Sequence, residues 1–357
     1  MKKRLLWGVF LGLAIMLTGC SQSTQGTDEN KISKTEDVNQ TEEKETSAES
    51  DSEAIVLKVG LHNPENHPLC QGIKKFDEIL DEKTNGRIRL EIYYGGQLGD
   101  KATHLQSLQT GALDMTMIMP GVLADYGATD LKVLTFPYLF DNVQHARAYL
   151  RSDSGKKLLD SIQTSGTLMT AVGTYQESAR NYFFKDKKVT SVNDMKGLKI
   201  RGQEGSIYLE AIESLGASPV SVAFSELFSA MQTGLVDGAE QPLSGYVNNQ
   251  FQEVSKYYLM DGHETSPNIV LMSEITWNSL TPEDQKTIKD CFAESNTYFE
   301  KLSDEKDKEY LQIIEDADAE IIYPDNPDEW RAAVQPVYDE YGEEYKEYIE
   351  AIKNTEY

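Results

Sequence analysis

Most of this sequence alternates between short apolar runs and longer runs in which apolar residues recur at helical spacing. The first three apolar runs cover residues 55–61, 87–94 and 113–119, and helical patterns at 68–84 and 103–109 separate them. Consecutive parallel strands need a crossover connection, and a helix is the usual one. The order therefore predicts a wound parallel sheet of the α/β class.

The same alternation begins again in the second half of the chain. Strand-like and helix-like runs follow one another there at 168–172, 181–184, 198–201, 206–215, 225–233, 236–240 and 269–272. Residues 54–357 supply about 300 residues, which suits two domains of ordinary size better than one. We therefore expect two α/β lobes with a ligand cleft between them.

A long uninterrupted helix is predicted after Thr281. Thr281 is a favourable N-cap residue, and Pro282 suits the first position of a helix. No glycine or proline follows until Pro324, and apolar residues keep helical spacing throughout. A helix of about 30 residues would span about 45 Å, enough to reach across both lobes. Trp330 and the tyrosines that follow it indicate a last helical region packed into the core.

The N-terminus carries the features of a bacterial export signal. Basic residues at positions 2–4 precede an apolar run at 5–17 that is too short for a membrane span. The run ends in Leu17-Thr18-Gly19-Cys20, which resembles the lipobox at which signal peptides are cut and the cysteine is lipidated. We predict a signal peptide at 1–19, a lipid on Cys20 that anchors the protein outside the cytoplasm to the cell membrane, and a disordered tether over 20–53. The alternative is an ordinary secretory signal with an incidental cysteine.

The charge balance excludes several classes of partner. The formal net charge is -25, with 59 aspartates and glutamates. A protein this acidic does not bind nucleic acid through its phosphates, and its net field repels anions. An anionic ligand therefore requires a local arginine. Cys70 and Cys291 are too few for a disulfide framework, and we interpret them as buried thiols.

One arginine lies in a setting that suits anion binding, at the end of the predicted strand 198–201. A helix, a turn and a second strand follow it, and that strand ends in Glu240 and Gln241. The guanidinium of Arg201 is a planar fork that meets a carboxylate with two parallel hydrogen bonds. This arrangement favours a cleft that presents one fixed cation to a small anion. The residues alone equally allow Arg180 and Arg201 to pair with surface carboxylates.

The common motifs of catalysis are absent from the sequence. It contains no Gly-x-Ser-x-Gly elbow, no His-Glu-x-x-His motif and no P-loop. His62 and His67 have no cluster of Cys or Asp beside them, which argues against a metal site. Glu240 has no evident partner carboxylate for acid–base chemistry. We therefore expect no catalytic residue, no cofactor and no metal.

Several segments, taken in order, resemble one protein family. They are Leu57-Lys58-Val59-Gly60 with His67-Pro68, Gly96-Gln97-Leu98-Gly99, 106–114, Phe136-Pro137-Tyr138-Leu139-Phe140, Gly197-Leu198-Lys199-Ile200-Arg201 and 223–242. The chain resembles, over residues 55–320, the dicarboxylate-binding type of substrate-binding protein from tripartite ATP-independent periplasmic (TRAP) transporters. The resemblance implies a two-lobed fold like that of periplasmic binding proteins, with the long helix spanning both lobes.

The resemblance also implies roles for individual residues. Arg201 would grip the ligand carboxylate, Arg180 would add a second cationic contact, and Phe224 would pack on the ligand. The other implied ligand positions are Glu240, Gln241, His62 and Met119. Two departures bear on ligand identity, because Gln241 stands where the family has asparagine, and Gly202-Gln203 stands where it usually has Val-Pro.

The function implied is the capture of a small organic acid outside the cytoplasm. The protein would deliver this acid to the large and small membrane subunits of an ion-coupled TRAP carrier. We divide the body into lobe I, residues 54–178 and 268–305, and lobe II, residues 179–267 and 306–357. The sequence leaves a second use open, as a ligand-sensing subunit for a membrane receptor kinase.

Overall fold

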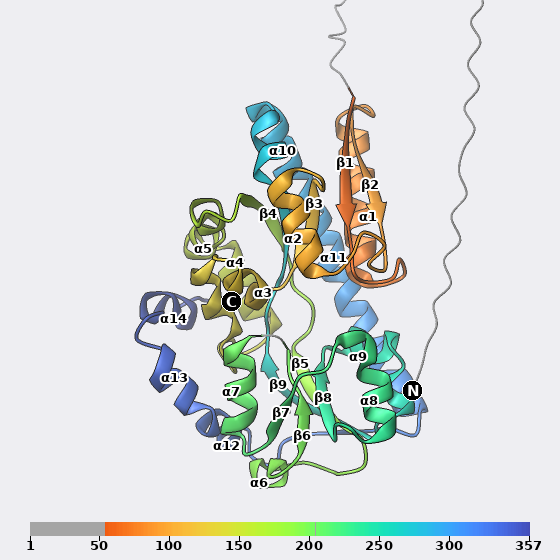
Figure 1. Ribbon diagram of the computed structural model, residues 1–357, viewed down its shortest axis with the longest axis vertical. Helices are drawn as coiled ribbons and strands as arrows, with labels where there is room; N and C mark the ends of the chain where they lie inside the picture. The colour runs from red at the N-terminus through yellow and green to blue at the C-terminus, as the bar shows by residue number, and fades with distance from the viewer. Residues whose placement is uncertain (1–53, 204) are drawn as a thin grey trace, which may run out of the picture. The chain divides into compact units, whose positions relative to one another are not determined.

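The computed structural model describes residues 54–203 and 205–357, which form one compact unit. The predicted signal peptide, tether and lipid-bearing Cys20 lie outside the described residues. Within the described part of the chain, no helix combines the length and the apolar character needed to cross a membrane. The strands form two sheets, as the repeated alternation of the sequence predicts. In Figure 1 the first sheet lies in the upper half of the view and the second in the lower half.

The first sheet, called sheet A, contains five strands in the order β2-β1-β3-β10-β4. Strand β1 runs parallel to both β2 and β3, which confirms the wound parallel unit expected from the first part of the chain. Strand β10 is antiparallel to β3 and β4 and brings a distant segment into this sheet. The bounds are β1 (Ile55–Gly60), β2 (Ile88–Tyr93), β3 (Met115–Ile118), β4 (Met169–Tyr175) and β10 (Asn268–Ser273).

The second sheet, called sheet B, contains six strands in the order β11-β9-β5-β8-β6-β7. Strand β6 is parallel to β7 and β8, whereas β5 is antiparallel to β8 and β9. The sequence patterns predicted β5, β6 and β8 but not β7, β9 or β11. The bounds are β5 (Arg180–Phe184), β6 (Lys199–Arg201), β7 (Ser218–Val220), β8 (Gly238–Gln241), β9 (Tyr257–Glu264) and β11 (Glu320–Ile322).

Two short connections join the sheets directly. Strand β4 ends at Tyr175 and β5 begins at Arg180, so residues 176–179 lead from sheet A into sheet B. Strand β9 ends at Glu264 and β10 begins at Asn268, so residues 265–267 lead back. Because each connection is so short, the edge of sheet A where β4 ends adjoins the edge of sheet B where β9 ends.

The long helix α11 (Pro282–Asp316) begins as the sequence predicts. The Thr281 hydroxyl oxygen accepts a hydrogen bond from the Asp284 backbone N–H at 3.1 Å, and Pro282 occupies the first turn. The helix has 35 residues and therefore extends about 52 Å. Phe292 and Phe299 on its first half pack into the core beside sheet A, and Ile314 near its end packs into the core beside sheet B.

The remaining helices cover the faces of the two sheets. Their bounds are α1 (Pro68–Lys83), α2 (Lys101–Thr110), α3 (Pro120–Asp125), α4 (Val143–Arg151), α5 (Asp153–Thr164), α6 (Val192–Met195), α7 (Ser206–Ser214), α8 (Leu227–Thr233), α9 (Leu243–Asn248) and α10 (Glu274–Ser279). Short 3-10 helices cover Thr129–Thr135, Phe224–Glu226 and Phe251–Glu253. Helix α1 shows the local logic, because Pro68 opens it and Asn85 and Gly86, both at positive φ, follow its end.

The last helical region consists of three short helices, α12 (Pro327–Ala333), α13 (Gln335–Tyr341) and α14 (Lys346–Lys353). Trp330 is fully buried beside the core of sheet B. Tyr345 and Ile349 instead join a cluster that contains Phe136 and other residues near sheet A. Trp330 and Tyr345 are thus core residues, whereas Tyr338, Tyr341 and Tyr348 are partly buried and pack against the core. The C-terminal helices therefore contact both cores.

Candidate functional site

The topology of sheet B brings the predicted cationic residues to one edge. Strands β6, β8 and β9 run in the same direction, so their carboxyl ends share an edge, and antiparallel β5 begins there. Arg201 ends β6, Gln241 ends β8, Glu264 ends β9, and Arg180 begins β5. The carboxyl edge of strands in an open α/β sheet is the usual place for a ligand.

Arg180 is buried and makes its contacts with protein carboxylates. Its Nε donates to the Glu240 carboxylate, and its Nη2 donates to the Glu240 backbone oxygen at 3.2 Å. Its Nε also lies 3.7 Å from Oε2 of Glu264. Burial opposes the charge on Arg180, but the Glu240 and Glu264 carboxylates outweigh it and raise the pKa of the guanidinium. Arg180 is therefore a permanently charged centre between two glutamates.

Arg201 is also buried, and two of its contacts define where its guanidinium lies. Its Nε donates to the Val222 backbone oxygen at 3.2 Å, and its Nη1 lies 3.8 Å from Oε1 of Glu240. The guanidinium carbon lies 5.9 Å from the centre of the Phe224 ring, and this ring is 44% exposed. Phe224 follows the end of β7, on the same edge of sheet B. The guanidinium is thus held in a defined orientation beside an accessible aromatic surface.

Glu264, which sequence patterns did not single out, is the second buried carboxylate of this cluster. Its Oε2 accepts a hydrogen bond from Nε2 of Gln203 at 2.5 Å. Burial raises the pKa of Glu264, Arg180 opposes this rise, and the charge on Glu240 adds to it. Next to it, His263 contacts Asp261 through Nδ1 at 2.9 Å, and Asp261 outweighs burial and raises the pKa of His263.

Two carboxylate oxygens in this cluster have no hydrogen-bond partner among the described residues. They are Oε1 of Glu240 and Oε1 of Glu264, and both atoms are buried. Both glutamates line a small cavity of about 20 Å³, together with Thr135, Gln203 and Tyr208 among others. A cavity of this size holds about one water molecule. The cluster therefore contains two unsatisfied acceptors, and the residues that carry them line a very small cavity.

Glu240, His263 and Glu264 are close enough to resemble a metal site. Their candidate ligand atoms all lie within 4.8 Å of one another. The Arg180 guanidinium, however, contacts both carboxylates and already supplies positive charge between them. A divalent cation placed there would face that guanidinium at close range, so we assign no metal to the cluster. Glu240 does have a neighbouring carboxylate, contrary to the sequence-based expectation, but Arg180 bridges the two.

The edge of sheet A holds the other two predicted ligand residues. His62 follows β1 and Met119 follows β3, and these strands are parallel, so both residues lie beyond the carboxyl edge of sheet A. The His62 ring lies 4.2 Å from that of His104, centre to centre. Burial, followed by the charges of His104 and Lys101, lowers the pKa of His62 to about 4. His62 is therefore neutral at pH 7, and its buried Nε2 lacks a hydrogen-bond partner among the described residues.

A tyrosine connects the two edges. Tyr208 of α7 lines the small cavity near sheet B. Its ring also packs on α3, because a Cβ added at Gly121 would lie 2.7 Å from Cε2 of Tyr208. Helix α3 follows directly after Met119, on the side of sheet A. Tyr208 thus contacts α3, which follows sheet A, and also lines the small cavity at the edge of sheet B.

The described contacts bring together some of the predicted site residues and not others. Arg180, Glu240, Arg201 and Phe224 form one connected cluster. Gln241 is buried next to it, and its side-chain oxygen faces α9 at Gly245. Among the described residues, no hydrogen bond, ion pair or ring contact joins His62 or Met119 to this cluster. The sequence analysis did not predict Glu264 or Tyr208 as site residues. The apolar residues at 257–260, where β9 begins, were the one local indication of the strand that carries Glu264.

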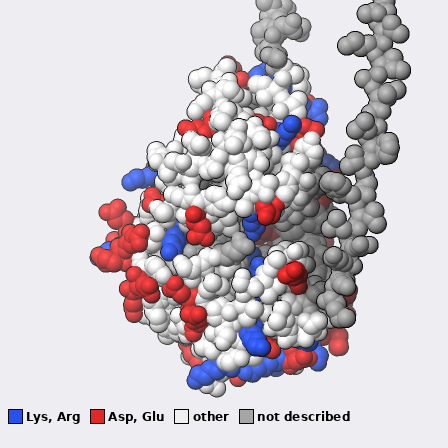
Figure 2. Space-filling model, viewed as in Figure 1, with Lys and Arg blue, Asp and Glu red and all other residues white. Residues whose placement is uncertain are grey.

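The surface charge contrasts with the buried arginines. On the face drawn in Figure 2, Asp and Glu side chains gather over α13 and α14. The exposed acidic residues of this segment are Asp339, Glu340, Glu343, Glu344, Glu347 and Glu350. Arg180 and Arg201 are only 8% and 7% exposed. The positive charge available to an anion is therefore local and internal, while the surface repels anions.

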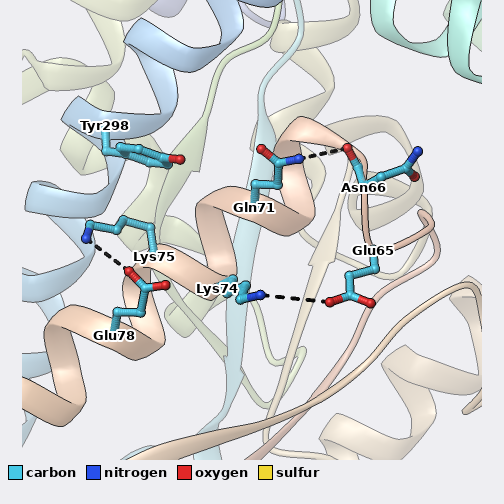
Figure 3. Close-up of a pocket in the computed structure, with 7 residues that line it drawn as sticks. All are labelled: Glu65, Asn66, Gln71, Lys74, Lys75, Glu78 and Tyr298. Atoms are coloured by element: carbon cyan, nitrogen blue, oxygen red, sulfur yellow. Dashed lines mark hydrogen bonds and ion pairs between the residues drawn. The ribbon is translucent and has the colours of Figure 1, made fainter.

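A separate groove lies on the outer face of α1, against α11 (Figure 3). Its charged side chains pair with one another, Lys74 with Glu65 at 3.9 Å and Lys75 with Glu78 at 3.0 Å. Tyr298 lies beside them, with the Lys75 ammonium 5.8 Å from its ring centre. Because these charges are mutually compensated and exposed, the groove has none of the features of the buried arginine cluster.

Comparison with known proteins places this chain in a family. Residues 59–344 match the family described as bacterial extracellular solute-binding protein, family 7 (DctP). The C4-dicarboxylate-binding periplasmic protein DctP of Rhodobacter capsulatus is 28% identical over 306 residues, which are 85% of this chain and 91% of that protein. The sialic acid-binding periplasmic protein SiaP of Vibrio cholerae is 29% identical over 301 residues, which are 83% and 91% of the two chains.

The solved structures agree. A TRAP periplasmic solute-binding protein from Pseudomonas putida F1, solved with bound D-glucuronate, is similar with a TM-score of 0.81 and 28% identity. The similarity covers 85% of this chain and 98% of that one. These comparisons confirm the resemblance and the two-lobed α/β fold, and they place the chain among binding proteins rather than enzymes. The chain belongs to family 7 of the bacterial extracellular solute-binding proteins.

Proposed function

We propose that this protein captures a small organic acid outside the cytoplasm through Arg201 and delivers it to an ion-coupled TRAP membrane carrier. The observation that carries the proposal is the buried Arg201 guanidinium, oriented by Val222 at the carboxyl edge of sheet B. The ligands named for the similar proteins, a C4-dicarboxylate, a sialic acid and D-glucuronate, all contain a carboxylate. A guanidinium fork suits that group.

Arg201 and its neighbours each make a different contact with the ligand in this proposal. Arg201 forms the direct charged contact with the ligand carboxylate, and the exposed Phe224 ring covers the apolar face of the ligand. Arg180 hydrogen-bonds to Glu240, which holds the Glu240 carboxylate in place and adds a second positive charge to the site. Exclusion of water from this site strengthens each of these interactions. Gln241, His62 and Met119 complete the ligand contacts in this proposal.

Closure of the two lobes accompanies capture. The connections 176–179 and 265–267 are the segments about which the sheets swing, as in other hinged binding proteins. The ligand drives closure only to the extent that it binds the closed form more tightly. Small-angle scattering tests this step, since closure decreases the radius of gyration when ligand is added. An unchanged radius at saturating ligand contradicts the closure.

The location of the protein is part of the same proposal. The family is extracellular, and the lipobox-like Leu17-Thr18-Gly19-Cys20 supports a lipid anchor on Cys20. The lobe assignment, residues 54–178 and 268–305 against 179–267 and 306–357, is likewise proposed. Strands of sheet A all fall in the first set, and strands of sheet B all fall in the second.

A thermal-shift screen against organic acids tests the proposed function. A ligand at 100 times its Kd stabilises the folded protein by about 2.7 kcal/mol, which raises the melting temperature measurably. Each acid is paired with an uncharged analogue in which an amide replaces the carboxylate. We expect stabilisation by at least one acid and none by its amide. Equal stabilisation by acid and amide, or no stabilisation by any acid, contradicts the proposal.

A further inference from the structure

We propose that Glu264, together with Glu240, makes this site selective for an acid with one carboxylate and several hydroxyl groups, against acids with a second carboxylate. The inference rests on the proposed function, in which Arg201 holds the ligand carboxylate. It deepens that function by naming the class of ligand, and it depends on two separate observations, the balance of buried charge and the unsatisfied acceptors.

The first observation is that the four buried charges of this cluster, counted within residues 54–203 and 205–357, cancel one another. Arg180 and Arg201 supply two positive charges, and Glu240 and Glu264 supply two negative ones. All four side chains are at most 10% exposed. One ligand carboxylate on Arg201 therefore leaves one excess negative charge, and a second carboxylate near Glu264 leaves two. Like charges brought together in a buried site are costly, so a second carboxylate is disfavoured.

The groups that face Glu264 from neighbouring elements do not alter this balance. Arg180 faces it from β5, Glu240 from β8 and Tyr208 from α7. His263, on the same strand, pairs with Asp261, so these two residues together add no net charge when His263 is protonated. Neutral His263 leaves Asp261 as a further negative charge, which strengthens the bias against a second ligand carboxylate.

The second observation is that two buried acceptors lack donors. Oε1 of Glu240 and Oε1 of Glu264 have no hydrogen-bond partner among residues 54–203 and 205–357. The nearby Ser266 hydroxyl does not serve, because it donates its one proton to the Leu134 backbone oxygen at 2.7 Å. An ionised carboxylate only accepts hydrogen bonds, so the missing groups must be donors. Ligand hydroxyls supply such donors directly or through a water in the small cavity, whereas ligand carboxylates supply none.

The position of the acceptors relative to Arg201 makes hydroxyl contact feasible. Oε1 of Glu240 lies 3.8 Å from Nη1 of Arg201, so a ligand carboxylate on Arg201 has this acceptor as its next neighbour. The candidate ligand atoms of Glu240 and Glu264 lie within 4.8 Å of each other. Hydroxyl groups on carbons that follow the carboxylate therefore have two glutamates within a short span.

Gln203 positions Glu264 for this role. Its amide Nε2 donates to Oε2 of Glu264 at 2.5 Å, which occupies one carboxylate oxygen and leaves Oε1 without a partner among the described residues. Gln203 belongs to the connection between β6, which ends in Arg201, and α7, which carries Tyr208. The residue that orients Glu264 is thus two positions away from the residue that binds the ligand carboxylate.

The test uses four acids with the same four-carbon chain, measured by titration calorimetry on the purified protein. D-Erythronate has one carboxylate and three hydroxyls, and butyrate has one carboxylate and no hydroxyl. Succinate has two carboxylates and no hydroxyl, and tartrate has two carboxylates and two hydroxyls. We expect D-erythronate to bind at least tenfold more tightly than each of the other three. This ranking is measured on the unaltered protein and needs no variant to fold.

The variant Glu264→Gln then assigns the selectivity to its residue. It removes the negative charge and keeps one acceptor oxygen, so the preference for D-erythronate over succinate should narrow at least tenfold. Glu213→Gln makes the same change on the exposed side of α7 and should leave the ratio unchanged. If the ratio of succinate Kd to D-erythronate Kd is the same in Glu264→Gln as in the unaltered protein, the role of Glu264 is contradicted.

The two proposals fail differently. If succinate binds as tightly as D-erythronate and Arg201→Ala abolishes binding of both, the selectivity is overturned and the proposed function stands. If none of the four acids, nor any acid of the thermal-shift screen, binds in a manner that requires Arg201, the proposed function is wrong, and the selectivity falls with it.

Discussion

Replacement of Arg201 by alanine is the sharpest test of how this protein holds its ligand. Arg201 is 7% exposed, so solvent and salt screen its charge only weakly. Without the Arg201 guanidinium, the ligand carboxylate loses its positively charged partner. Oε1 of Glu240, which lies 3.8 Å from Nη1 of Arg201, loses a nearby positive charge as well. Removing one partner of a buried, hydrogen-bonded charge pair typically costs 2–5 kcal/mol. We therefore expect the Kd to rise about 30-fold to about 5,000-fold.

The substitution Arg201→Lys separates charge from geometry. Lysine keeps the positive charge but offers no planar fork, so it cannot form the two parallel hydrogen bonds. Its loss of affinity should lie between those of the unaltered protein and Arg201→Ala, at about 1–2 kcal/mol if one charged hydrogen bond is lost. Equal losses for lysine and alanine indicate that the fork, and not the charge, dominates.

The assay is titration calorimetry with the acid that stabilises the protein best in the thermal-shift screen. The matched control is Arg151→Ala, because Arg151 is 57% exposed and pairs with Glu300 at the surface. A surface pair of this kind contributes 0–1 kcal/mol, and it lies outside the site, so ligand affinity should not change. A change below about 1 kcal/mol for Arg201→Ala, in a variant that melts normally, refutes the assignment of the ligand carboxylate to Arg201.

Two further predictions concern stability and location. Burial, with the nearby charge of Glu177, raises the pKa of Asp307 to about 7, so the native state binds more protons than the unfolded state between about pH 4 and pH 7. This group therefore lowers the free energy of unfolding as pH rises through that window. In urea titrations, Asp307→Asn should raise the free energy of unfolding by about 1–3 kcal/mol at pH 8 but not at pH 4. Equal effects of the substitution at both pH values contradict this prediction. Cys20→Ser should release the protein from membranes into the medium or periplasm, as followed by fractionation and mass spectrometry of the N-terminus, and a variant that stays membrane-bound excludes the lipid anchor.

Local patterns were sufficient for the elements whose boundaries depend on nearby residues. Helix α11 was predicted because Thr281 and Pro282 form a helix start and no helix breaker follows for a long distance. Strands β1, β2 and β3 were predicted because their apolar residues recur in short runs between helical segments. The last helical region was less well predicted, since Pro327 and Pro336 each open a new short helix.

Strand β9 shows where local patterns fail. It begins with apolar residues at 257–260 but ends in Asp261, Gly262, His263 and Glu264, which resemble a loop. The strand forms because β5 supplies hydrogen-bond partners along it, with a shift in register near Arg180. Backbone pairing to a distant strand thus overrides unfavourable local composition. Glu264 was missed for this reason.

The arginines could be nominated from sequence because an acidic chain with an arginine at a strand end is unusual and the surrounding motifs resemble a known family. The partners of those arginines could not be nominated. Arg180 meets Glu240 across 60 positions of sequence, and it meets Glu264 only because β8, β5 and β9 are neighbours in sheet B. Residue spacing along one strand decides which groups reach an edge of the sheet, whereas strand order decides which of them become neighbours. The charge balance of this cluster therefore belongs to the tertiary structure.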